Sequence, residues 1–75
     1  MLMEKLKSTR LSGNLRTARL DLGLTQRECA IRAGVALISW VSYERGVRWP
    51  CNELQLDKIA KAVDSTAAAL LGKRR

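Results

Sequence analysis

The fold is decided by residues 24–50, which read LTQRECAIRAGVALISWVSYERGVRWP. Thr25 and Glu28 stand at the spacing of a capping box, and this pair predicts that a helix begins at Thr25. Gly34 predicts its end, because glycine adopts a positive φ without strain. The residues of this helix predicted to face inward are small, which lets another helix approach closely, and they are Cys29, Ala30 and Ala33.

A second short helix is predicted over residues 37–45. Trp40 and Tyr43 are spaced i, i+3 and therefore share one face of it. Gly46 predicts its end, and Val35 in the preceding turn is expected to fill the core. Two short helices joined by a tight glycine turn form a helix-turn-helix motif by spacing alone.

Three further helices are predicted outside this motif, each beginning at a residue that can cap it. The caps are Ser12, Asn52 and Thr66. The apolar positions that we expect to face the core, with Leu20 the more peripheral, are Leu15, Ala18, Leu20, Leu22, Leu56, Ile59, Ala60, Val63, Ala67, Leu70 and Leu71. The sequence therefore predicts an all-α, compact five-helix bundle that contains the helix-turn-helix motif.

The length of 75 residues allows one domain. Apolar residues make up 47% of the chain and aromatic residues 4%, which favours packed helices over a β-sandwich. We expect a helical domain over residues 12–72, preceded by a basic arm over residues 1–11 and followed by a basic tail over residues 73–75.

The charge of the chain indicates the class of its partner. Lys and Arg number 14 against 7 Asp and Glu, which gives a formal charge of +7. Such a basic domain favours a polyanion, either nucleic acid or an acidic membrane surface, and a soluble protein with a charged coat is the alternative. There is no run of 18 apolar residues and no signal-peptide pattern, so we expect a cytoplasmic protein without a membrane span.

The two cysteines, Cys29 and Cys51, cannot supply the four ligands of a zinc site. We expect Cys29 to be a small core residue and Cys51 to lie in a loop. A redox role for the pair is disfavoured in a reducing compartment. Because the chain has no His and no nucleophile–base pair, the sequence predicts no enzyme, no metal site and no cofactor.

A long set of residues follows the pattern of one family in order, and it consists of Leu15, Arg16, Arg19, Gly23, Leu24, Thr25, Gln26, Glu28, Ala30, Ala33, Gly34, Val35, Tyr43, Glu44, Arg45, Gly46, Arg48, Pro50, Ile59, Ala60, Lys61, Ala62, Val63, Leu70 and Leu71. Through them residues 12–72 resemble the phage repressor and Cro-like helix-turn-helix proteins (the XRE family). The resemblance implies a lambda-repressor-like DNA-binding domain in a sequence-specific transcriptional regulator, expected to be a repressor. It also implies a homodimer that binds double-stranded operator DNA through the second motif helix.

The resemblance also implies roles for individual residues. Gln26 matches a position that binds a DNA phosphate, at a helix start whose free N–H groups also attract anions. Arg19 and Glu44 match a partly buried structural ion pair. The candidates for contacts with the DNA backbone are Arg45, Arg48 and Trp49, followed by Arg16 and Arg27.

Two assignments stay open at this point. Trp49 is large, and it can pack on a sugar-phosphate strand, cover a dimer interface or cover the core. The dimer surface is expected around the last helix, with Leu70 and Leu71.

The base-reading positions of the family fall on Ala36, Leu37, Ile38, Ser39, Val41 and Ser42. None of them carries the Arg, Lys, Asn or Gln that bidentate base reading requires, and Ala36 leaves its helix without a side-chain cap. Three accounts are open. The apolar side chains contact thymine methyl groups, with DNA shape completing the specificity; they are buried in a rearranged core; or they bind a protein partner. The last account makes the chain a protein-interaction module such as an antitoxin or an anti-repressor.

Overall fold

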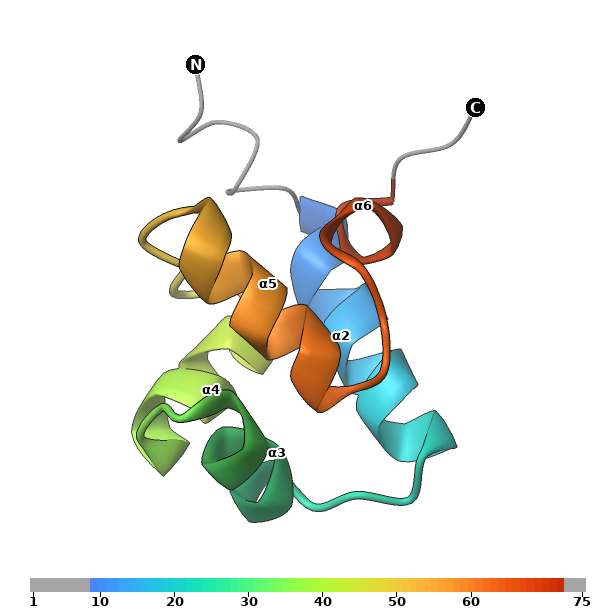
Figure 1. Cartoon of the computed structure of the whole chain (residues 1–75), viewed down its shortest axis with the longest axis vertical. Coiled ribbons are helices and arrows are strands. Elements are labelled where there is room, and N and C mark those ends of the chain that lie inside the picture. Colours follow the sequence, from blue (N-terminus) through green and yellow to red (C-terminus); the bar gives the residue numbers. More distant parts are fainter. Residues whose placement is uncertain (1–8, 73–75) are drawn as a thin grey trace.

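Five α-helices and no strand make up residues 9–72, the part of the chain that the computed structural model describes. They are α2 (Thr9–Asp21), α3 (Gln26–Ala33), α4 (Leu37–Arg45), α5 (Glu53–Ala62) and α6 (Ala67–Leu70). The predicted all-α, five-helix bundle is therefore confirmed. Figure 1 shows α3 and α4 side by side below α5, and α6 beside α2. No helix within residues 9–72 is long and apolar enough to cross a membrane.

Side-chain caps begin three of these helices where the sequence predicts them. Thr25 Oγ1 accepts a hydrogen bond from the backbone N–H of Glu28 at 3.0 Å, and the Thr25 N–H donates to Glu28 Oε1 at 2.8 Å. These bonds hold the pKa of Glu28 below its usual value, because they stabilise the carboxylate. Asn52 and Thr66 likewise accept from the N–H three residues later, at 2.8 Å and 3.2 Å. Each cap contributes about 1 kcal/mol to helix stability.

The beginning of α2 differs from the prediction. The chain is already helical at Thr9, so Ser12 lies inside the helix and is not its N-cap. Leu11, which the prediction assigned to the basic arm, is 1% exposed and belongs to the core. The reason is helical spacing: Leu11 stands one turn before Leu15 and shares its inward face. The predicted helix start at Ser12 is therefore wrong.

The end of α2 confirms one apolar position and contradicts another. Leu20 is 54% exposed, in agreement with its predicted peripheral place. Leu22, predicted to face the core, is 42% exposed, because it follows the last helical residue in the turn that leads to Gly23. The remainder of the predicted arm, residues 1–8, and the predicted tail, residues 73–75, lie outside the described residues.

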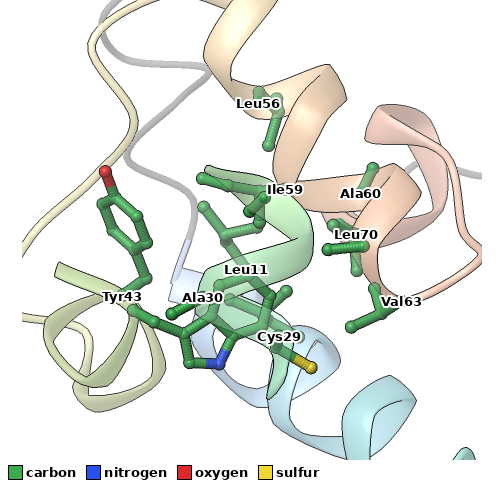
Figure 2. Close-up of a cluster of buried hydrophobic side chains, with 13 residues drawn as sticks. Leu11, Cys29, Ala30, Tyr43, Leu56, Ile59, Ala60, Val63 and Leu70 are labelled. Atoms are coloured by element: carbon green, nitrogen blue, oxygen red, sulfur yellow. The ribbon is translucent and has the colours of Figure 1, made fainter. Parts of the chain in front are cut away.

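One hydrophobic core joins the described helices. Figure 2 shows Leu11, Ile59 and Leu70 of α2, α5 and α6 gathered in one cluster, with Tyr43 of α4 at its edge. Trp40 is the largest side chain of this core and is 0% exposed. Each large apolar side chain buried in this way contributes about 1.5–3 kcal/mol. The predicted core positions found buried are Leu15, Cys29, Ala30, Ala33, Trp40, Tyr43, Leu56, Ile59, Ala60, Val63 and Leu70.

Small side chains let α3 pack closely against α4 and α5. Cys29, Ala30 and Ala33 are 0%, 3% and 4% exposed and form the inner face of α3. Burial raises the pKa of the Cys29 thiol, as expected of a structural core cysteine. Cys51 is exposed in the loop before α5, and neither cysteine forms a disulfide. The predicted places of both cysteines are confirmed.

Side-chain donors also tie helix ends together. Asn14 Nδ2 donates to the carbonyl oxygen of Leu70 at 2.9 Å and holds α6 on α2. Arg32 Nη1 donates to the carbonyl oxygen of Ala62 at 3.1 Å, which joins α3 to the C-terminal end of α5. These bonds satisfy carbonyl groups that a helix end leaves without an intrahelical partner.

Candidate nucleic-acid interface

The turn between α3 and α4 sets the direction in which α4 leaves α3. Gly34 has a φ of 71°, in the left-handed region, and the N–H of Val35 donates to the carbonyl oxygen of Ala30 at 3.0 Å. A Cβ at Gly34 would meet no atom within 4 Å, so the backbone conformation requires this glycine and the available space does not. Ala36 is extended, with a ψ of 149°, and provides no side-chain cap for α4.

A bidentate ion pair fixes α4 against α2. Arg19 Nε donates to Glu44 Oε2 at 2.6 Å, and Arg19 Nη2 donates to Glu44 Oε1 at 3.0 Å. The side chains are 11% and 3% exposed, so water screens the pair weakly. The hydrogen bond to Glu44 raises the pKa of Arg19 above its usual value. The predicted ion pair is present, and removal of one partner of such a buried pair costs about 3–5 kcal/mol.

Glu44 has two further donors that the sequence analysis did not identify. Trp40 Nε1 donates to Glu44 Oε2 at 2.5 Å, and Gln26 Nε2 donates to Glu44 Oε1 at 3.2 Å. Arg19 Nη1 also donates to the carbonyl oxygen of Leu24 at 2.9 Å. The Glu44 carboxylate therefore accepts four hydrogen bonds and joins α2, α3 and α4 at one point. The spacing of Trp40 and Glu44, one helical turn apart, is the signal that would have identified the indole donor.

Gln26 is the first residue of α3, and its half-buried side chain lies on Glu44. A side-chain amide carries two N–H groups, and one of them is used by this bond. The position at the helix start also brings unpaired backbone N–H groups to the surface, where they attract anions. The predicted bond from Gln26 to a phosphate stays a prediction.

The face of α4 that points away from the core consists of Ile38, Val41, Ser42 and Arg45, which we call the outer face. Ile38 is 71% exposed, and Arg45 is exposed at the other end of the helix. Val41 and Ser42 are half-buried between them. The i, i+3, i+4 and i+7 spacing of these residues places them along one side of the helix.

The predicted base-reading residues divide between the two sides of α4. Leu37 is half-buried and packs against the core, so it lies toward the inner side, and its predicted contact with a base stays a prediction. Ala36 is exposed at the N-cap, and Ser39 is half-buried at the edge of the outer face. Trp40 is fully buried in its expected place, and with Ile38 exposed the account of a rearranged core is wrong for the outer face.

Exposed arginine side chains lie on α4, in the loop after it, on α3 and on α2. Arg48 Nη1 donates to Ser39 Oγ at 3.1 Å, which holds the guanidinium beside the N-terminal half of α4. Arg45 lies on α4 itself, and Arg27 is exposed in the first turn of α3. Arg16 is exposed on α2. Glu44, the one acidic residue of α4, faces inward and is 3% exposed, so α4 presents no exposed carboxylate.

The loop that carries Arg48 is held by a residue that the sequence analysis did not single out. Gln55 Oε1 accepts from the backbone N–H of Cys51 at 2.8 Å and from the hydroxyl of Tyr43 at 3.2 Å. Burial raises the pKa of the Tyr43 hydroxyl above its usual value. Trp49 is half-buried and packs against the core, so of its three predicted roles the structure supports the cover over the core.

These features define a helix-turn-helix bundle in which the second motif helix, α4, turns its outer face to the solvent. Neither a family model nor a curated protein sequence matches the chain. A solved structure described as the hypothetical transcription factor NHTF from Neisseria superimposes with a TM-score of 0.76 and 29% sequence identity. The match covers 88% of this chain and 74% of that protein. The chain therefore has a transcription-factor-like fold.

Proposed function

We propose that the chain is a sequence-specific DNA-binding transcriptional regulator, acting as a repressor, that inserts α4 into the major groove. The observation that carries the proposal is the contrast on α4. Its inner side is fixed by the four hydrogen bonds to Glu44, while Ile38 on its outer face is 71% exposed. The major groove of B-DNA is wide enough to admit an α-helix presented in this way.

The charges around α4 support a nucleic-acid partner. Arg45 on the outer face, Arg48 beside Ser39 and Arg27 on α3 are exposed, and the chain carries a formal charge of +7. Contacts of this kind with phosphates release counterions and supply sequence-independent affinity. The hypothetical transcription factor that shares the fold is consistent with this proposal.

The proposal includes a homodimer on a two-fold operator. A single motif helix contacts only a few base pairs, and helix-turn-helix proteins double this contact by binding two half-sites about one helical turn apart. Enrichment of duplex DNA from a random pool tests this point. A recovered site with two inverted half-sites at that spacing supports the dimer, whereas a single half-site contradicts it.

The salt dependence of duplex binding tests the proposed function itself. A protein that contacts six to ten phosphates loses about 10³–10⁵-fold in affinity between 50 and 200 mM salt. We expect this loss in a fluorescence anisotropy titration of labelled duplex. Failure to bind duplex DNA at 50 mM salt would overturn the proposal.

A second candidate function rests on the exposure of Ile38. An exposed apolar residue on a fixed helix also suits a protein-interaction module such as an antitoxin or an anti-repressor. This candidate predicts negligible duplex affinity at every salt concentration. The same titration therefore separates the two functions.

A further inference from the structure

We infer that the N-terminal half of α4 reads the C5-methyl groups of thymine, with Ile38 as the residue that determines this specificity. The inference rests on the proposed function and names the chemical feature of the DNA that the outer face recognises. Its support comes from the donors that are present near this end of α4, from the exposure of Ile38 and from the charges around it.

Residues 36–44 lack the side chains that form bidentate hydrogen bonds with bases. Residues 36–44 contain no Arg, Lys, Asn or Gln, so the bidentate pairs that read guanine or adenine cannot form from this segment. Arg45 lies seven residues beyond Ile38, which is about 10 Å along the helix. The Gln26 amide is directed to Glu44. Apart from Arg48, whose Nη1 donates to Ser39 Oγ and which we assign to a phosphate, only hydroxyl groups and apolar side chains are left to contact bases at the N-terminal half of α4.

The major groove offers an apolar group to these side chains, the C5-methyl group of thymine. Among the four bases, thymine places a C5-methyl group in that groove, and apolar side chains contact it. Ile38 stands at the second position of α4 with 71% of its surface exposed, and Ala36 is exposed at the N-cap. An apolar side chain this exposed gains free energy when it and a methyl group leave water together.

The surroundings of Ile38 favour DNA over a protein as the partner of the outer face. Ile38 is the one large apolar residue of α4 that is exposed, since Leu37 and Val41 are half-buried. One side chain cannot supply the ~1,000 Å² that a stable protein interface needs. Exposed Arg45 on α4 and Arg48 beside Ser39, together with the inward-facing Glu44, instead suit the phosphate groups that flank a groove.

The hydroxyl groups near Ile38 are compatible with this assignment. Ser39 Oγ already accepts a hydrogen bond from Arg48, which leaves its own proton to donate. A hydroxyl contacts either base pair and discriminates weakly between them. The methyl group is therefore the feature of the base pair that the N-terminal half of α4 distinguishes best.

The experiment uses the full chain and a duplex enriched from a random pool. Each thymine of the enriched site is replaced in turn by deoxyuridine, by cytosine and by 5-methylcytosine, with the complementary base adjusted. Deoxyuridine removes only the methyl group, whereas 5-methylcytosine keeps the methyl group and changes the hydrogen-bonding edge. Methyl reading predicts that thymine and 5-methylcytosine bind alike and that deoxyuridine and cytosine bind about fourfold more weakly for each contacted methyl.

The variant Ile38→Ala tests the residue assignment. In this variant the preference for thymine over deoxyuridine should disappear, while the salt dependence of binding stays as in the parent protein. Ile31→Ala is the matched control, because Ile31 is 72% exposed on α3 and outside the outer face. The control should keep the thymine preference.

Three outcomes would overturn the inference without touching the proposed function. The first is that thymine and deoxyuridine bind equally well. The second is that thymine and deoxyuridine both bind better than cytosine and 5-methylcytosine, and the third is that Ile38→Ala keeps the preference for the methyl group. Absence of any duplex binding would instead overturn the proposed function. A protein partner captured by the outer face in place of DNA belongs to that last outcome.

Discussion

The two sides of α4 differ in what fixes their residues. On the inner side Trp40, Tyr43 and Glu44 are buried and hydrogen-bonded, so a change in any of them disturbs two or three helices at once. On the outer face, Ile38 packs against little of the protein and is free to suit a partner. The comparison teaches that the fold specifies one side of this helix, whereas the partner specifies the other.

The strongest test of this difference is Glu44→Ala. The change leaves the donors of Arg19, Trp40 and Gln26 without their acceptor, and we expect a loss of about 3–5 kcal/mol in the free energy of unfolding. In a domain of this size the melting temperature should fall by at least about 12 °C. Thermal denaturation followed by circular dichroism measures it.

The matched control for this loss is Asp57→Ala. Asp57 is an exposed carboxylate on α5, so its removal changes the net charge equally and should change stability by less than about 0.5 kcal/mol. Equal melting temperatures of the two variants would mean that the carboxylate of Glu44 does not hold the three helices together.

A smaller effect on stability is expected at the turn before α4, which sets the direction of this helix. Gly34→Ala forces an alanine into a φ of 71° without any steric contact, so the cost is backbone strain alone, about 1–2 kcal/mol. Gly13→Ala is the opposite case, because Gly13 lies inside α2 with open space around it. That change should stabilise the protein by about 0.5–1 kcal/mol.

Urea denaturation of both glycine variants measures whether the free energy of unfolding falls for Gly34→Ala and rises for Gly13→Ala. The same sign for the two substitutions would contradict the argument that the left-handed conformation, and not the space, requires Gly34. A destabilised Gly34→Ala protein that keeps full DNA affinity when folded would show that the direction of α4 survives the strain.

The parts of the fold that the sequence predicted depend on neighbours along the chain. The capping box of Thr25 and Glu28 and the glycine turn at Gly34 involve residues at most a few positions apart, and both are found in the structure. The start of α2 was missed because Ser12 suits a cap in isolation. The i, i+4 spacing of Leu11 and Leu15 would have extended the inward face by one turn.

The candidate interface was less predictable, and the reason is physical. The contact of Gln26 with Glu44 joins residues 18 positions apart, so it needs the tertiary structure. The packing of Leu37 against the core was also hard to predict, because the exact rotation of α4 decides which side chains reach the core. For Ile38 the fold imposes no requirement, so only a binding experiment identifies its partner.

On the partner-facing side, Arg48→Ala should change binding and not folding. Arg48 is exposed and donates a hydrogen bond to Ser39 Oγ, and we assign its guanidinium to a phosphate, so we expect equal weakening of binding to all duplex sequences. The slope of log affinity against log salt should decrease by about 1. Lys61→Ala removes an equal charge from α5 and is the control. A loss confined to one base position would mean that Arg48 contacts a base.

The smallest effect on stability is expected for Ile38→Ala. Because Ile38 is 71% exposed and alanine is the better helix former, the free energy of unfolding should change by less than about 0.5 kcal/mol. Ile31→Ala, equally exposed on α3, should behave in the same way in urea denaturation. A loss above about 1.5 kcal/mol for Ile38→Ala alone would mean that this side chain packs within the protein. The outer face would then be part of the fold, and the difference between the two sides of α4 would disappear.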